Sequence, residues 1–287
     1  MNQRSTIAFL ALCLLSAVLW WKPLLATFQL AWTNDAYTHI VLIIPLTLAM
    51  LSADRKLIDN REQFGSYGGI FILGLVLVLL AFARWSYATP SDVRLAMYVA
   101  ALVFGWLGAA YLCFGSSVFR VFLFPFCFLF WIVPLPSTPL NWIVEFLQDE
   151  SVAVTRWFFQ LARVPVTQDA NMLSIPGLDV VVGPECSSIR SSLILVVLTM
   201  VLAHLFLRSW WRKALLVLLA IPLAVLKNAL RIFVIVQLGM HVDRRYLDGW
   251  LHHHGGVIFL MIALGAVVVA LWILGRSEWN RSELAVN

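Results

Sequence analysis

Charged residues are scarce in this chain of 287 residues: 12% are Asp, Glu, Lys or Arg, whereas 62% are hydrophobic. Soluble domains average roughly a quarter charged residues. The shortage therefore excludes a soluble protein. Long apolar segments recur along the whole length, and a bilayer core admits only helices or closed barrels. The composition predicts an all-α fold, a polytopic membrane helix bundle.

Several functional signatures are also missing. The 4 cysteines lie far apart and show neither disulfide nor zinc spacing. The basic residues behind the net charge of +5 are scattered through short loops and form no stripe for nucleic acid. No nucleotide or metal motif is present. We therefore expect no cofactor, no metal and no nucleic-acid partner.

The apolar segments predict about eight transmembrane helices. They run from about 7–21, 40–51, 69–82, 95–114, 118–133, 188–207, 214–238 and 257–274. No small-residue cleavage site follows the first, so we expect it to be retained. The chain is predicted to form a single membrane domain, residues 1–287. Its parts are spans 1–5 in 1–136, an extracytoplasmic region in 137–185, spans 6–8 in 186–274, and a cytoplasmic tail in 275–287.

The region 137–185 is the only sizeable piece predicted outside the membrane. Apolar residues recur at helical spacing over 139–163, opposed by a polar face that includes Gln148. This pattern is typical of an amphipathic helix lying in the membrane interface. In 164–183, Pro176-Gly177 separates short β-branched runs, which predicts a hairpin. The hairpin would lead the chain to residue 186 from the aqueous side.

Charge asymmetry sets the orientation. An even number of spans places both termini on one side, and the segments on that side carry an excess of basic residues. The positive-inside rule therefore predicts cytoplasmic termini. We expect a multi-pass protein of the cytoplasmic (inner) membrane, with the polar residues at 186 and 252 facing the periplasm or exterior.

A polar stretch, 183–192, runs directly into the apolar segment that follows it. Charges at membrane depth cost several kcal/mol unless they are paired or functional. Cys186 at a helix N-terminus, with Arg190 one turn later, would have its thiolate stabilised by the helix dipole and the cation. An ordinary N-cap formed by Ser187 or Ser188, with Cys186 as a small buried filler, explains the same residues.

Two further polar groups are predicted at the same depth. Lys227, Asn228 and Arg231 interrupt the seventh span, and His252-His253-His254 precede the eighth. A thiol, a cation and a group that titrates near neutral pH are the parts of a thiol acyl-transfer site. Each also has a simpler explanation: Arg231 as a structural cation of the bundle, Lys227 as a snorkelling side chain, and the histidines as solvated interface residues.

Two other classes of protein fit part of this pattern. A secondary transporter would place Arg190, Lys227 and Arg231 in a charged cavity, although no symmetry-related pair of broken helices is seen. A membrane metalloprotease would use the histidines. However, His252 and His254 do not share a helix face, and no His-Glu-x-x-His is present.

At these residues the chain resembles the exosortase/archaeosortase family of membrane cysteine transpeptidases. Its members carry a Cys-Ser-Gly-x-Arg-Ser signature, matched here by residues 186–191 except that Ser188 replaces Gly. Their Asn-x-x-Arg motif is similar to Asn228-Ala229-Leu230-Arg231. A His a few residues before a Gly-aromatic pair is matched in 252–259, with Val257 in place of the aromatic residue. The segments 32–39 and 134–136, and Pro45, also look like family landmarks.

The resemblance implies a protein-sorting enzyme. Such enzymes act on exported proteins that end in a sorting signal of the Pro-Glu-Pro type: a short motif, a transmembrane helix and a basic tail. The implied roles are Cys186 as nucleophile, Arg231 as stabiliser of the transition state or of the substrate, and His252 as acid and base. The expected supporting residues are Glu185, Ser187, Arg190, Asn228, His253 and His254. The exact motif, the acceptor nucleophile, and the choice between hydrolysis and transfer stay open.

Overall fold

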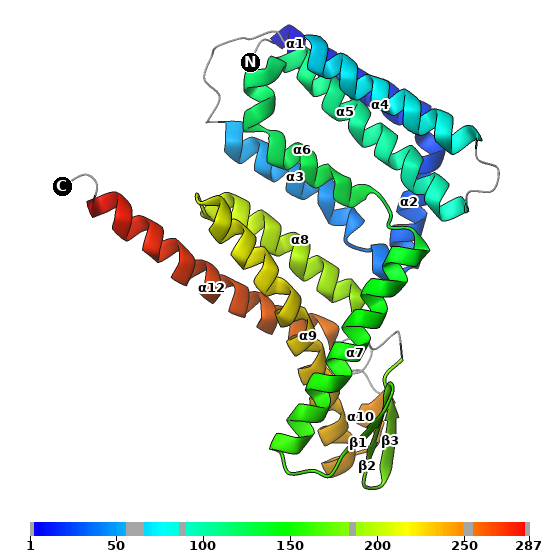
Figure 1. The fold of residues 1–287 in the computed structure, drawn as a ribbon, viewed down its shortest axis with the longest axis vertical. Helices are drawn as coiled ribbons and strands as arrows, with labels where there is room; N and C mark the ends of the chain where they lie inside the picture. The colour runs from blue at the N-terminus through cyan, green and yellow to red at the C-terminus, as the bar shows by residue number, and fades with distance from the viewer. Residues whose placement is uncertain (1–2, 56–65, 86–89, 184–187, 249–254, 285–287) are drawn as a thin grey trace. The chain divides into compact units, whose positions relative to one another are not determined.

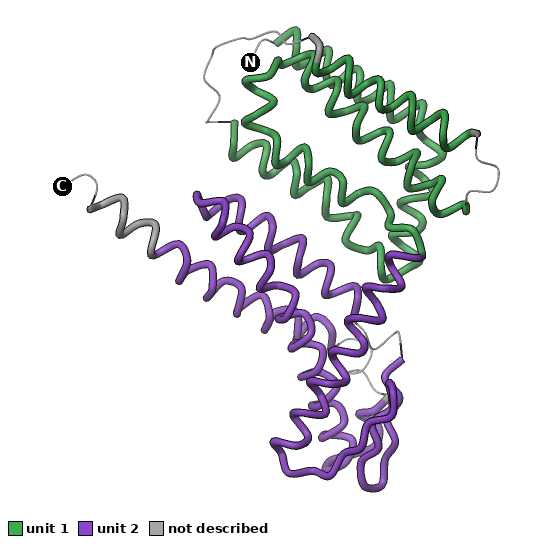
Figure 2. Tube along the Cα trace, viewed as in Figure 1, with its two compact units in different colours: residues 1–137 green, residues 138–287 purple. Residues whose placement is uncertain are grey.

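The computed structural model describes residues 3–55, 66–85, 90–183, 188–248 and 255–284. These residues form two compact units, 1–137 and 138–287, shown in different colours in Figure 2. Each unit is described by itself below. The expectation of a single membrane domain stays a prediction.

The first unit is helical and is organised around one long helix, α5. Its elements are α1 (Gln3–Leu19), α2 (Trp21–Thr33), η1 (Asp35–Tyr37), α3 (Ile40–Asp54), α4 (Ser66–Trp85), α5 (Ser91–Val121), α6 (Leu123–Phe128) and η3 (Leu129–Ile132). Helices α1 and α4 pack along α5, and α3 packs against α6 and η3 (Figure 1). The indole of Trp20 donates to the carbonyl of Tyr98 at 2.9 Å, which ties the α1–α2 junction to α5.

Two sequence landmarks meet inside this unit. The hydroxyl of Tyr37, in the segment 32–39, donates to the carbonyl of Leu135 at 2.7 Å. The ring of His39 lies edge-on to Trp131, with 5.8 Å between ring centroids. Both Tyr37 and His39 are buried. The polar segment before α3 is therefore a packing element that anchors the chain around Pro134 and Pro136.

The second unit holds a small sheet and four longer helices. Its elements are α7 (Ser137–Leu161, whose first residue belongs to the first unit), β1 (Thr167–Asp169), β2 (Met172–Ile175), β3 (Leu178–Val181), α8 (Ile189–Phe206), α9 (Trp210–His241), α10 (Arg245–Asp248) and α12 (Gly256–Leu284). Helices α8, α9 and α12 pack against one another, and α10 packs on α9.

The sheet has three antiparallel strands in the order β1-β2-β3. The predicted hairpin is confirmed: Ile175 pairs with Leu178 across the two-residue turn Pro176-Gly177. Gly177 has a φ of 85°, a conformation that glycine adopts at no steric cost. Proline is common at the position before such a glycine, where Pro176 lies. The strand β1 was not predicted because Thr167–Asp169 is polar and lacks alternation. It is held by backbone pairing to β2.

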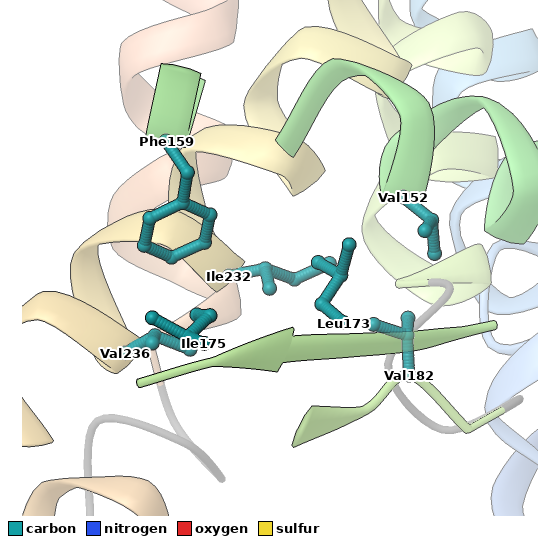
Figure 3. Packing of buried hydrophobic residues seen from close by; sticks show 7 residues of the cluster. All are labelled: Val152, Phe159, Leu173, Ile175, Val182, Ile232 and Val236. Carbon is teal, nitrogen blue, oxygen red and sulfur yellow. The ribbon is translucent and has the colours of Figure 1, made fainter. Parts of the chain in front are cut away.

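A hydrophobic cluster joins the sheet to α7 and α9 (Figure 3). Phe159 of α7, Leu173 of β2 and Ile232 of α9 point into it, and Phe159 and Leu173 are fully buried. The other buried members are Val152, Ile175, Val182 and Val236. Helix α7 (137–161) has nearly the bounds of the predicted amphipathic helix (139–163). Its buried face packs on protein. Gln148, expected on the polar face, is only 6% exposed.

The helices establish a multi-pass membrane protein. Among the described residues, five helices are long and apolar enough to cross a membrane, or up to seven if each of two bent pairs counts as one span. The first bent pair joins α1 and α2 at 78°, where a single span over 7–21 was predicted. The predicted span 118–133 is divided between the end of α5, α6 and η3. Gly115, with a φ of 76°, interrupts the helix just before it. The count of eight stays a prediction.

Candidate active site

The polar face of α9 supplies the buried polar residues of the candidate site. Lys227, Asn228 and Arg231 are 5%, 1% and 9% exposed, so all three are inside the second unit. Lys227 and Arg231 are four residues apart on one helix and share a face, as the spacing predicts. Lys227 does not snorkel toward the membrane surface, because it is buried and donates to a serine.

That serine lies in the first turn of α8. Lys227 Nζ donates to Ser191 Oγ, and a guanidinium nitrogen of Arg231 donates to Ser188 Oγ. The Ser191 hydroxyl in turn donates to the Ser188 carbonyl at 3.2 Å. The two cations of α9 therefore hold the residues at which α8 begins.

Ser188 has an unusual backbone for its residue type. It is the N-cap of α8, with φ 52° and ψ 33° in the left-handed region. A non-glycine residue pays roughly 1–2 kcal/mol for this conformation. Glycine would not, which is a physical reason for the Gly that related signatures carry at this position. Helix α8 begins at Ile189, so the helical register between Cys186 and Arg190 assumed from the sequence does not extend through Ser188.

Polar side chains of α7 hold the same part of α9 from another direction. Asn228 Nδ2 donates to Ser151 Oγ at 3.0 Å, and Thr155 Oγ1 lies 3.3 Å from the carbonyl of Ala229. Ser151 and Thr155 are fully buried. The amide of Gln148 donates to the carbonyl of Val182, just past β3. Helix α7 therefore fixes both α9 and the end of the sheet.

A cavity of about 290 Å³ opens beside Arg231. It lies between β3, the C-terminal half of α9 and α10. Its lining residues are Leu178, Asp179, Val180, Val181, Val182, Arg231, Ile232, Ile235, Val236 and Leu247. Apart from Arg231 and Asp179 these side chains are apolar, so the cavity combines one cation and one carboxylate with hydrophobic walls.

The structure brings Arg231 to Ser188 at the beginning of α8, and Asn228 to Ser151 of α7. Arg190 lies in the first turn of α8 and is exposed. Of the three residues expected in a charged transporter cavity, Arg231 lines the cavity described above. The remaining predicted site residues lie outside the described residues: Glu185, Cys186, Ser187, His252, His253 and His254.

Sequence reasoning missed the residues that support Arg231 and Asn228. Ser151 and Thr155 follow the period of the buried face of α7, on which Val152 and Phe159 also lie. Small hydroxyl residues inside an apolar stripe were the available signal. Ser188 and Ser191 belong to the polar stretch, but nothing in the sequence pairs them with particular cations of α9.

The arrangement is suited to negative charge. A buried guanidinium offers several fixed donors, and in a site of low dielectric such donors stabilise developing charge strongly. Within the described ranges, no group of three His, Cys, Asp or Glu residues could hold a metal ion. Oxyanion or carboxylate binding by Arg231 is therefore the chemistry that the described part of the site supports.

Comparison with known proteins identifies a family. A family model described as transmembrane exosortase matches residues 31–269. The matched range covers most of the chain, including 186–191, Asn228, Arg231 and 252–254. No curated protein and no solved structure gives a match.

Proposed function

Because the chain belongs to the transmembrane exosortase family, a family of membrane transpeptidases and proteases, we propose that it cleaves exported proteins through a thioester on Cys186. The substrates are exported proteins that end in a short motif, a transmembrane helix and a basic tail. The active site faces the exterior of the inner membrane, and both termini are cytoplasmic. Product release occurs by water or by transfer to an acceptor nucleophile.

One observation carries this proposal: buried Arg231 contacts Ser188, two residues from Cys186 in sequence. Two residues of chain span at most about 7 Å, so the covalent chain alone keeps Cys186 near this cation. A nearby cation favours the thiolate, which is the nucleophilic form of cysteine. The same guanidinium can then hold the oxygen of the carbonyl under attack.

The first half of the reaction forms the thioester. The Cys186 sulfur attacks the carbonyl carbon of the scissile peptide bond, and the electron pair of the C=O bond moves to oxygen. Arg231 stabilises that oxyanion. As the C–N bond breaks, His252 gives a proton to the leaving nitrogen. The sorting signal with its transmembrane helix departs, and the exported protein stays bound to Cys186.

The second half regenerates the enzyme. An amine, a hydroxyl or water attacks the thioester carbonyl while His252, now neutral, removes its proton. The oxyanion forms again beside Arg231 and collapses with release of the Cys186 thiolate. Both acceptor classes need the same three groups, so the choice between them depends on what reaches the site.

The test is a cysteine panel in membranes that contain a tagged substrate. Cys186→Ala should abolish processing while leaving the protein in the membrane. Cys13→Ala, Cys113→Ala and Cys127→Ala should process normally, because those thiols lie within apolar helices, where nothing favours the reactive thiolate. Normal processing by Cys186→Ala would refute the thiol mechanism.

A further inference from the structure

Strand β3 is an edge of the sheet. The order β1-β2-β3 gives it a partner on one side only, and among the described residues no strand pairs with its other side. In an antiparallel ladder, backbone groups point alternately toward and away from the partner strand. Leu178 flanks the two-residue turn, so its backbone N–H and C=O groups point toward β2, and those of Val180 do the same. The N–H and C=O groups of Asp179 and Val181 therefore point away from β2, to the open side of β3.

This open edge borders the cavity that contains Arg231. The inner face of β3, through Leu178 and Val180, packs against the cluster that includes Ile232 and Val236 of α9. A strand added beside β3 would continue that face over Ile235 of α9 and Leu247 of α10, which line the cavity. Its alternate side chains would enter the apolar space, and its backbone would lie next to Arg231.

We infer that β3 is the docking strand for the substrate: the extended segment before the scissile bond pairs with the outer edge of β3 and places one apolar side chain in the cavity beside Arg231. This inference rests on the proposed function and adds how the peptide is held.

An extended peptide fits these observations better than a lipid or a helix does. Strand addition supplies main-chain hydrogen bonds that do not depend on sequence, and side-chain pockets add specificity. A cavity of about 290 Å³ is at the small end of ligand sites, so it accepts one or two side chains and not a whole helix. Val181, in β3, is 68% exposed, so its side chain is not packed beneath other described residues.

Photo-crosslinking tests binding apart from catalysis. A photoreactive benzoyl-phenylalanine replaces Val181 in the Cys186→Ala protein, which is co-expressed with a tagged substrate. The matched control carries the same residue at Gln168, whose backbone faces outward on the opposite edge, β1. Crosslinking to the substrate at position 181 but not at 168 supports docking on β3. Equal crosslinking at both positions, or none at 181, overturns it.

Proline substitution tests the edge hydrogen bonds in the full-length active protein. Val181→Pro removes an outward N–H and should lower the processing rate per detergent-stable molecule by about tenfold, through loss of a buried hydrogen bond. Gln168→Pro makes the same change on β1 and should leave the rate near that of the wild type. Val181→Ala keeps the N–H and should lose less activity than Val181→Pro. Equal rates for Val181→Pro and Gln168→Pro would overturn the inference.

The two levels of the proposal fail differently. If processing depends on Cys186 but Val181→Pro and Gln168→Pro behave alike, docking on β3 is wrong and the thiol mechanism stands. If Cys186→Ala still processes the substrate, the proposed function is wrong and this inference falls with it.

Discussion

Ser188 combines a backbone cost with a contact in the site. Its left-handed φ of 52° strains any residue with a Cβ, whereas its hydroxyl accepts from the guanidinium of Arg231. The Ser191 hydroxyl accepts a hydrogen bond from Lys227 and donates one to the Ser188 carbonyl. Residues 188–191 are thus positioned by α9 and not by capping of their own helix, since no side-chain cap bond is made at Ser188.

A matched pair of substitutions isolates the backbone cost. Ser188→Gly and Ser188→Ala both remove the hydroxyl, but only alanine keeps a Cβ in the left-handed region. We expect Ser188→Gly to be more stable than Ser188→Ala by about 1 kcal/mol. Thermal unfolding of the detergent-solubilised variants measures the difference. An alanine variant at least as stable as the glycine variant would contradict the left-handed conformation.

The geometry of the Arg231 guanidinium matters as much as its charge. A guanidinium can hold a carboxylate or a developing oxyanion with two parallel bonds, whereas an ammonium is a point charge. Arg231→Lys should therefore lose about 100- to 1000-fold in rate, the usual effect of removing an oxyanion donor. Processing is measured per membrane-inserted, detergent-stable molecule.

Lys227→Gln is the matched control one turn away on α9. Glutamine keeps a donor for Ser191, so we expect lower yield of folded protein with a much smaller change in rate per molecule. An unimpaired normalised rate in Arg231→Lys would mean that Arg231 serves only to stabilise the bundle.

Sequence patterns predicted some residues of the site and not others. A cation and an amide inside an apolar span are conspicuous, so Arg231 and Asn228 could be singled out. Their partners could not, because pairing Ser188 with Arg231 or Ser151 with Asn228 requires knowing how α7, α8 and α9 pack. Gln148 was assigned to the exposed polar face because its side chain is polar. In the structure it is buried, and its amide donates to the carbonyl of Val182.

At the scale of elements, α7 joins the sheet to α9. Its buried face carries the polar pair Ser151 and Thr155 toward α9, and Phe159 into the cluster with the sheet. The helical spacing predicted this helix but not this face, because the apolar residues Trp142 and Trp157 are 68% and 53% exposed. It did not show whether the face meets lipid headgroups or protein, because an amphipathic pattern is the same in both settings. The turn at Pro176-Gly177 was predictable from local chemistry, whereas β1 depends on pairing with β2.

A substitution on each face of α7 tests this packing. Phe159 is fully buried, so Phe159→Ala should cost about 3–5 kcal/mol of stability, as large-to-small changes in cores do. Trp157, 53% exposed on the same helix, serves as the control, and Trp157→Ala should cost far less. The measurement is thermal unfolding in detergent. An equal or larger loss for Trp157→Ala would mean that α7 does not pack on the sheet through Phe159.

At the scale of the whole molecule, the orientation of the chain decides which compartment the site serves. Helices α8 and α9 are joined by the short connection 207–209, so the beginning of α8 and the end of α9 are predicted to lie on the same side of the membrane. Ser188, Arg231 and the sheet are predicted to lie on that side. The basic excess on the N-terminal side predicts that it is the exterior.

Reporter fusions measure this orientation directly. At Trp211, in the first turn of α9, a fused reporter that works only in the cytoplasm should be active, and one that works only outside should be inactive. At Asp243, just beyond α9, the reporter that works only outside the cytoplasm should be active instead. The reverse pattern would place the site in the cytoplasm, where it could not meet an exported substrate.

The most direct test of the central claim is capture of the thioester on Cys186. Hydroxylamine is added to membranes that contain the wild-type protein and a tagged substrate, and the new C-terminus of the substrate is read by mass spectrometry. A thioester intermediate predicts a hydroxamate at the cleavage point, because hydroxylamine competes with water or the natural acceptor, and no cleavage in Cys186→Ala. Cleavage that yields only a free carboxylate at saturating hydroxylamine, or any cleavage by Cys186→Ala, would contradict it.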